Sequence, residues 1–286
     1  MISSIIFLYK HPYNIQRPFF AFFRWVLWKL IQSLQFKQLK IKVWGNRFLY
    51  LNYDSFQSMW VMYNWIVDWE EFQLIEHYVE KNDVLFDIGT NMGFYTVWMS
   101  RFINQNGKIH CFEPDKLNYS RLQANISLNK IKSLIKTNRY AVSDFNGWLK
   151  FTEDRDGENH ISNNALESTV EVQSIALDTY LEIQGIQHIA YMKIDVEGFE
   201  LQVLKGAREI LENKKVDIIQ LEINQQLNNA GTKVSDLLFF LKNYGYNLYS
   251  YEPVSRCLIP IQYTHERENY FAIEDILKVN TRIRNV

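Results

Sequence analysis

From residue 83 onward, short apolar runs alternate with segments in which apolar residues recur every three or four positions. The runs are typical of buried strands, and the recurring pattern is typical of helices that pack by one face. Alternation of the two predicts a mainly parallel sheet with right-handed crossovers. We expect strands at 84–88, 108–113, 135–142, 189–195 and 216–223, and helices at 92–104, 116–129, 199–212 and 233–243.

The alternation is interrupted twice. Strand-like segments at 148–151 and 170–175 flank a polar stretch at 152–168, and a polar loop of that length is usually functional or disordered. Near the end of the chain, two strand patterns at 246–251 and 269–273 follow one another with no helix between them. This predicts one antiparallel pair at an edge of the sheet.

The first 80 residues have a different pattern. Residues 39–51 alternate apolar and polar positions on both sides of Gly45-Asn46, which predicts a hairpin. Residues 55–80 have helical spacing and carry three tryptophans, so we expect one or two helices covering the front of the main domain. No linker follows them. We therefore treat 1–79 as an N-terminal extension and 80–286 as the main domain.

Composition limits the protein class without identifying it. The 286 residues are 47% hydrophobic and carry a net charge of −1, which is ordinary for a globular protein and gives no argument for nucleic-acid binding. Cys111 and Cys257 form neither a disulfide framework nor a zinc-binding spacing. We expect a reducing, cytoplasmic setting.

The near-zero net charge hides a basic N-terminus. Every charged side chain in residues 1–50 is Lys or Arg, and residues 18–31 are rich in Phe and Trp. Arg24 and Lys29 interrupt this segment, so it falls short of the roughly 18 apolar residues of a spanning helix. Two interpretations remain open. We favour a helix packed on the main domain or on a second subunit of a homo-oligomer; the other is a helix lying on the inner face of a membrane.

Candidate chemistry begins where the first predicted strand ends. Residues 87–93 have the order Asp-x-Gly-x-Asn-x-Gly, whereas a dinucleotide fingerprint has G-x-G-x-x-G and a pyrophosphate at the helix start. Asp87 would repel that pyrophosphate. S-adenosylmethionine (AdoMet) has no phosphate and carries an ammonium group, which suits Asp87 and a close backbone approach at Gly89. Asn91 offers both a donor and an acceptor.

Further acids end the other predicted strands. Glu113 ends the second strand, at a distance from the glycine loop that suits an acid bound to a ribose diol. Asp195 and Glu197 follow the fourth strand, and Glu222 closes the fifth. Ligands of such sheets lie at the carboxyl ends of the strands where strand order reverses. We therefore expect Asp195, Glu197 and Glu222 to face one pocket. Lys193 is either the ion-pair partner of Asp195 or a solvated lysine.

These motifs form an ordered set. They are residues 87–96 (Asp-Ile-Gly-Thr-Asn-Met-Gly-Phe-Tyr-Thr), 112–114 (Phe-Glu-Pro), 141–147 (Ala-Val-Ser-Asp-Phe-Asn-Gly), 177–178 (Leu-Asp), 193–200 (Lys-Ile-Asp-Val-Glu-Gly-Phe-Glu) and 203–206 (Val-Leu-Lys-Gly). Over residues 80–225 the chain resembles the FkbM family of AdoMet-dependent methyltransferases. The resemblance implies a class I, Rossmann-like α/β fold with a mainly parallel seven-stranded sheet and an antiparallel edge strand. It also implies O-methyl transfer to a sugar, glycan or natural product.

The resemblance also implies roles for single residues. Asp87, Gly89, Asn91 and Gly93 would hold the methionine part of AdoMet, assisted by Thr96, and Thr90 stands in the same loop where the family usually has Ala. Glu113 would bind the ribose, while Pro114, Ala141 and Val142 would lie beside the adenine. Asp195 would close the pocket near the sulfonium.

The base that removes the acceptor's proton remains open among four residues, namely Asp195, Glu197, His160 and Glu222. We assign no metal site, although Asp195 and Glu222 could instead hold a divalent metal such as Mg²⁺. Two other functions stay as alternatives. One is a non-catalytic scaffold with the AdoMet-binding fold. The other is a nucleotide-linked oxidoreductase, which the spacing of the glycine loop disfavours.

Overall fold

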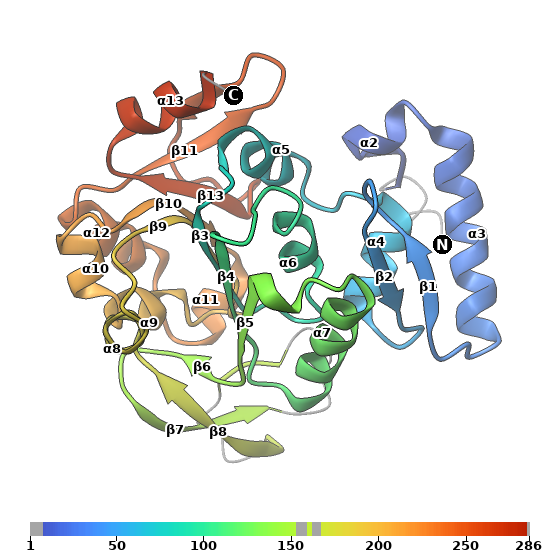
Figure 1. The fold of residues 1–286 in the computed structure, drawn as a ribbon, viewed down its shortest axis with the longest axis horizontal. Helices are drawn as coiled ribbons and strands as arrows, with labels where there is room; N and C mark the ends of the chain where they lie inside the picture. Colours follow the sequence, from blue (N-terminus) through green and yellow to red (C-terminus); the bar gives the residue numbers. More distant parts are fainter. Residues whose placement is uncertain (1–7, 153–158, 162–166, 285–286) are drawn as a thin grey trace.

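The computed structural model describes residues 8–152, 159–161 and 167–284, and an eight-stranded sheet runs through its centre (Figure 1). The strand order is β12-β11-β13-β10-β9-β3-β4-β5. The strands are β3 (Val84–Ile88), β4 (Lys108–Phe112), β5 (Ile135–Asn138), β9 (Ile189–Ile194), β10 (Val216–Glu222), β11 (Asn247–Glu252), β12 (Cys257–Pro260) and β13 (Asn269–Ile273). The seven strands implied by the resemblance are present, and β12 adds an eighth at the antiparallel edge.

The order in which the chain adds strands to the sheet reverses between β3 and β9. From β3 the chain builds outward to β4 and β5, all parallel, whereas β9 and β10 extend the other half in parallel. β3 and β9 pair directly, with Asp87 opposite Lys193 and Ile88 opposite Ile194. Their carboxyl ends therefore lie side by side at the switch point, which is where open α/β sheets bind ligands.

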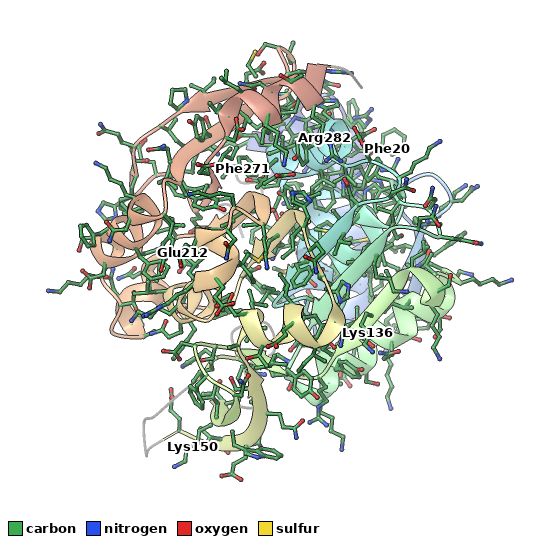
Figure 2. The ribbon with its side chains drawn as sticks, turned by 60° about the vertical axis from the view of Figure 1, so that its left-hand side comes forward. Phe20, Lys136, Lys150, Glu212, Phe271 and Arg282 are labelled. Atoms are coloured by element: carbon green, nitrogen blue, oxygen red, sulfur yellow. The ribbon has the colours of Figure 1, made fainter. Side chains whose placement is uncertain are left out.

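Alternate side chains of the strands build two cores, one on each face of the sheet. Leu85 and Ile218 belong to the first core, which is covered by α5 (Trp69–Tyr78), α6 (Phe94–Met99), α7 (Lys116–Leu128) and α13 (Ile276–Arg284). Phe86 and Ile219 belong to the second, under α8 (Leu177–Gln184), α9 (Glu200–Lys205), α10 (Arg208–Glu212), α11 (Gln225–Asn229) and α12 (Val234–Asn243). Figure 2 shows Phe271 inside the molecule and Lys136, Lys150 and Glu212 at its surface.

Two predicted elements are divided in the structure. The strand expected at 135–142 ends at Asn138, and Ala141–Val142 forms β6 in a separate sheet with β8 (Thr169–Ile175) and β7 (Gly147–Thr152). The helix expected at 199–212 breaks into α9 and α10 at Gly206, where the backbone meets Ser143: a Cβ at Gly206 would lie 2.0 Å from the Ser143 carbonyl oxygen. Both breaks come from contacts between distant segments. The polar stretch at 152–168 falls largely on 153–158 and 162–166, outside the described residues.

The N-terminal segment lies beside the sheet, at the right-hand side of Figure 1, where its hairpin packs on α7. It contains α2 (Pro12–Ile15), α3 (Pro18–Ser33), the predicted hairpin as β1 (Leu39–Lys42) and β2 (Phe48–Leu51), and α4 (Phe56–Asn64). The Tyr50 N–H donates to the side-chain oxygen of Asn125 on α7 at 2.7 Å, and the Phe48 N–H donates to that of Asn129, just after α7, at 2.8 Å. None of the helices in the described part of the chain is long and apolar enough to cross a membrane.

Candidate active site

A cavity of ≈560 Å³ lies between the carboxyl ends of the central strands and the N-terminal helices. Nine of the residues selected from the sequence line it. They are Gly89, Asn91, Glu113, Pro114, Ala141, Val142, Asp195, Glu197 and Glu222. The volume is in the range of small-molecule sites. The remaining five, Asp87, Thr90, Gly93, Thr96 and His160, are not among the lining residues.

The glycine loop after β3 approaches the loop after β9 backbone to backbone. Gly89 has φ +79°, and a Cβ at this position would lie 1.7 Å from the Asp195 carbonyl oxygen. The Asp195 N–H donates to the Ile88 carbonyl at 3.0 Å, which holds the two loops together. Only glycine fits this contact, because it has no Cβ and tolerates positive φ.

Glu113 joins the end of β4 to the same loop. Its Oε2 accepts from the Asn91 N–H at 2.7 Å, and its Oε1 accepts from the Asp115 N–H at 2.9 Å. Burial raises the pKa of Glu113 to about 8, against the lowering effect of these two hydrogen bonds. Each carboxylate oxygen has a further lone pair that can accept from a ligand hydroxyl.

Asp87 supports the loop from behind the cavity wall. It is fully buried, and its Oδ2 accepts from the Thr96 hydroxyl at 2.6 Å. Its Oδ1 has no hydrogen-bond partner among the described residues. Burial raises the pKa of Asp87, and the nearby Lys193 counteracts that rise. Thr90 donates to the Asp87 carbonyl at 2.7 Å, so both threonines shape the loop from within.

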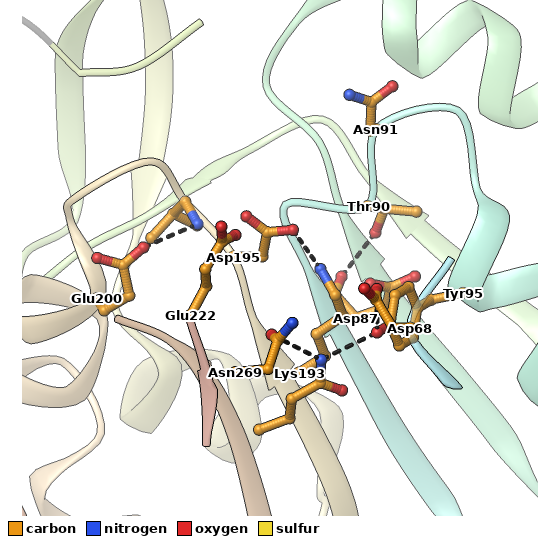
Figure 3. Close-up of polar contacts among 12 residues, drawn as sticks. Asp68, Asp87, Thr90, Asn91, Tyr95, Lys193, Asp195, Glu200, Glu222 and Asn269 are labelled. Atoms are coloured by element: carbon orange, nitrogen blue, oxygen red, sulfur yellow. Dashed lines mark hydrogen bonds and ion pairs between the residues drawn. The ribbon is translucent and has the colours of Figure 1, made fainter. Parts of the chain in front are cut away.

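The acids at the ends of β9 and β10 meet in a charged cluster around Lys193 (Figure 3). Lys193 is buried, and its Nζ donates to the Asp195 Oδ2 at 2.6 Å. Burial lowers the pKa of Lys193, but the carboxylates of Asp195 and Asp87 raise it more strongly, to above its ordinary value. Lys193 is therefore the ion-pair partner of Asp195, and both side chains line the cavity.

Asp195 and Glu222 have pKa values that are shifted in opposite directions. Burial raises the pKa of Asp195, but Lys193 and a hydrogen bond with Glu222 lower it more strongly, so that it lies below its ordinary value. Burial and the adjacent Asp195 carboxylate raise the pKa of Glu222 well above its ordinary value. These shifts favour the ionised form of Asp195 and the protonated form of Glu222, which can then donate the hydrogen bond between them. Asn224 donates to the Glu222 Oε1 at 2.9 Å.

The other two base candidates have different positions. Glu197 lines the cavity from the turn after β9, where its φ is +53°. The structure does not bring His160 together with Asp195: Asn159 and Ile161 line the cavity, whereas the His160 Nε2 lies 3.8 Å from the Glu167 Oε2. Within the described ranges, no three His, Cys, Asp or Glu side chains are placed to hold a metal ion.

The family described as Methyltransferase FkbM domain matches residues 87–248, more than half of the chain. The protein belongs to the FkbM methyltransferase family. Its sheet order agrees with the class I methyltransferase fold that the resemblance implied. The match contains the glycine loop, Glu113, Asp195 and Glu222, and it excludes the N-terminal helices and hairpin.

Two curated methyltransferases and one solved methyltransferase structure are among the proteins similar to this chain. Hexuronic acid methyltransferase AglP of Haloferax volcanii is 25% identical over 167 residues, 58% of this chain and 67% of the relative. 2-O-methyltransferase NoeI of Sinorhizobium fredii is 28% identical over 170 residues, which are 52% of this chain and 66% of the relative. The crystal structure of methyltransferase FkbM from Methylobacillus flagellatus aligns at 16% identity and TM-score 0.42, covering 68% of this chain and 44% of that one. The chain spans about two thirds of the length of these two curated relatives.

Residues outside the family match complete the cavity, and sequence reasoning missed them. Asp68 precedes α5 at the N-cap position, but its side chain makes no cap hydrogen bond. It instead accepts from the Tyr95 hydroxyl at 2.6 Å, and Gln220 donates to the same hydroxyl at 3.0 Å. From α4, Phe56 and Trp60 form an edge-to-face pair, with ring centroids 5.6 Å apart, on the cavity wall. Locally, Asp68 reads as an ordinary cap, so the sequence held no signal for this role.

Proposed function

We propose that this protein is an AdoMet-dependent methyltransferase that methylates a hydroxyl group of a sugar, a glycan or a related natural product. The observation that carries the proposal is the Lys193–Asp195–Glu222 cluster, which faces the same cavity as the glycine loop and Glu113. A family that transfers methyl groups, a ribose-binding acid and an ionised carboxylate at the acceptor side together support O-methyl transfer.

The residues present fit AdoMet. Glu113 has acceptor capacity left for a ribose diol, and Ala141 and Val142 give an apolar wall for the adenine. In the part of the chain that the structure describes, Asp87 keeps one buried carboxylate oxygen without a hydrogen-bond partner, behind the loop that would receive the methionine part. The backbone at Gly89 leaves no room for a side chain. When bound, AdoMet supplies a methyl group on a sulfonium, which is a good leaving group.

The chain's own task is then to align the acceptor and to take its proton, and alignment alone can contribute about 7–11 kcal/mol. Asp195 is the proton acceptor in this proposal. The hydroxyl oxygen gains the methyl group and gives its proton to the Asp195 carboxylate. Lys193 keeps that carboxylate ionised, and the neutral Glu222 fixes its orientation by donating a hydrogen bond.

A sugar-like acceptor is supported by the outer part of the cavity. Trp60 and Phe56 offer aromatic faces, on which a sugar ring can pack, and Asp68, Asn224 and Asn269 offer hydrogen-bonding groups for hydroxyls. Two curated relatives carry names that refer to hexuronic acid and to 2-O-methylation. We place the reaction in a reducing, cytoplasmic compartment, since both cysteines are free thiols.

The test combines calorimetry with a transfer assay. AdoMet should bind the purified chain and NAD should not, and methyl-labelled AdoMet should label a component of a panel of cell glycans and lipid-linked sugars. Asp195→Asn should lower turnover by about 10²- to 10⁴-fold with little change in AdoMet affinity, as expected for loss of a general base. Asp236→Asn, on the exposed side of α12, is the matched control. Absence of AdoMet binding would refute the proposal, and full activity in Asp195→Asn would refute the assigned base.

A further inference from the structure

Helix α3 has one face that packs against the protein and one that does not. Ala21, Arg24, Trp28 and Ile31 are its buried positions. With about 3.6 residues per turn, positions 19, 23 and 30 fall on the opposite side. Their side chains are 88% (Phe19), 63% (Phe23) and 55% (Leu30) exposed. Phe22, on the same side, and Leu34 and Phe36, just after the helix, extend this apolar surface. We call these six residues the outer α3 surface.

Buried hydrogen bonds fix the direction of this surface. The Arg24 guanidinium points inward, where its Nη2 donates to the Asn14 Oδ1 at 2.7 Å and to the Tyr63 carbonyl at 3.2 Å. Its Nε donates to the Met62 carbonyl at 3.1 Å, at the end of α4. Because these bonds hold α3 against α4, the outer α3 surface stays directed away from the molecule. In Figure 1, α3 lies at the outer right-hand side, beyond α4 and the hairpin.

The charges around the outer α3 surface have one sign. From residue 8 to residue 53 every charged side chain is basic, and Arg17, Lys29, Lys37, Lys40 and Lys42 are exposed. The first acid, Asp54, is paired with Arg121 at 2.8 Å. Exposed aromatic side chains on a segment whose charges are all basic match an anionic lipid surface. A second copy docking through the same face would place two basic surfaces against each other, which disfavours self-association there.

We propose that the outer α3 surface docks on an anionic bilayer, with α3 parallel to the membrane plane. Phe19, Phe23 and Leu30 enter the boundary between headgroups and acyl chains, while Lys29 and Lys37 contact lipid phosphates. Helix α4, packed on the inner side of α3, carries Phe56 and Trp60 on the cavity wall, so docking also brings the cavity near the membrane. The proposal does not depend on the methyl-transfer reaction.

Vesicle flotation of the full chain tests this. We expect binding to vesicles that contain phosphatidylglycerol, weak binding to pure phosphatidylcholine, and loss of binding at about 0.5 M salt, because high salt screens the lysines. The triple variant Phe19→Ser, Phe23→Ser, Leu30→Ser should bind at least about tenfold more weakly. Phe239→Ser, equally exposed on α12, is the control and should bind like the wild type.

A charge variant and a fold check complete the design. Lys29→Glu with Lys37→Glu should weaken binding to phosphatidylglycerol vesicles while leaving the aromatic side chains in place. AdoMet binding by calorimetry should be the same in all variants, which separates lost docking from misfolding. Equal vesicle binding by the wild type and the triple variant would overturn the proposal. So would a wild-type dimer that the triple variant abolishes in the absence of any vesicle binding, because it would identify a second copy as the occupant.

Discussion

Glu113 shows how a single carboxyl group can join two loops at the candidate site. It accepts backbone hydrogen bonds from the glycine loop and from the turn after β4, and it is still buried enough that its pKa is raised to about 8. In the ligand-free protein near pH 7 the group is therefore largely protonated. Hydroxyl donors of a ribose favour the ionised form. Binding is then coupled to release of a proton from this side chain.

AdoMet affinity should consequently depend on pH through Glu113. We expect the affinity to rise by up to about tenfold per pH unit from about pH 6 and to level off above about pH 8, as one proton is released. Glu113→Gln should bind more weakly and show no such slope. Calorimetry in buffers of different ionisation enthalpy measures the protons released. The same slope in wild type and Glu113→Gln would assign the proton to another group.

Gly89 allows a second prediction with a matched control. Both Gly89→Ala and Gly185→Ala place a side chain at positive φ, which costs about 1–2 kcal/mol. Only at Gly89 does the new Cβ clash, with the Asp195 carbonyl 1.7 Å away, whereas nothing lies within 4 Å at Gly185. We expect Gly89→Ala to lose a further 1–3 kcal/mol, roughly, of unfolding free energy together with AdoMet binding. Urea unfolding and AdoMet titration measure both, and equal behaviour of the two variants would contradict the close contact.

The sequence allowed us to predict those residues of the candidate site that interrupt an apolar pattern. Glu113, Asp195 and Glu222 end buried strands, where a charge needs a reason, and topology then places them at one edge. Asp68 lies at a helix N-cap and Trp60 on a helix, where an acid or an aromatic is ordinary, so only the folded chain reveals their position at the cavity. His160 looked suitable by residue type, but the structure places it outside the cavity lining.

At the scale of elements, local pattern predicted where strands and helices occur and missed where distant segments divide them. β3, β4, β9 and β10 follow the expected ranges within a residue. The division between α9 and α10 needs the contact of Gly206 with Ser143, and the end of β5 needs β6 to pair with β8. Such information lies in neighbours that are remote in sequence. Predictions about an element should therefore address the contacts that fix it.

Helix α3 is an example, because one side chain attaches it to α4. Arg24→Ala would leave the Asn14 Oδ1 and the Met62 carbonyl without their Arg24 donor, whereas the Tyr63 carbonyl would keep its hydrogen bond from the Asn14 Nδ2 at 3.1 Å. An unsatisfied buried polar group costs about 1–3 kcal/mol, so we expect a loss of about 2 kcal/mol in unfolding free energy. Hydrogen exchange should show faster opening in residues 18–33. Lys29→Ala on the exposed side is the control, and unchanged exchange in both variants would show that packing alone holds the helix.

At the scale of the molecule, the candidate site lies at the carboxyl end of the sheet, and an ionic network centred on the buried Asp217 lies at the other end. Asp217, at the start of β10, accepts from the Tyr78 hydroxyl of α5 at 2.7 Å and interacts with His188 at 2.9 Å. Lys278 of α13 donates to the same carboxylate. One side chain thus links the sheet, the covering helix α5 and the last helix α13, at the end of the sheet away from the cavity.

This network makes stability fall in acid in a way that one variant can isolate. Burial raises the pKa of Asp217, but the hydrogen bonds from His188, Lys278 and Tyr78 lower it more strongly, so that it lies below its ordinary value. A carboxyl group with a lowered folded-state pKa stabilises the protein above its unfolded pKa of about 3.9, and that contribution disappears as pH falls through the folded-state value. Asp217→Asn should therefore lose about 1–3 kcal/mol of unfolding free energy at neutral pH, where the amide accepts fewer of the three hydrogen bonds. The difference from wild type should shrink as pH falls below about 3.9 and toward the lowered folded-state pKa of Asp217. Urea unfolding of wild type, Asp217→Asn and the exposed control Asp236→Asn across this range measures it. A difference that stays constant with pH would mean that Asp217 acts through its shape and hydrogen bonds, and its charge would then contribute nothing to holding α5 and α13 against the sheet.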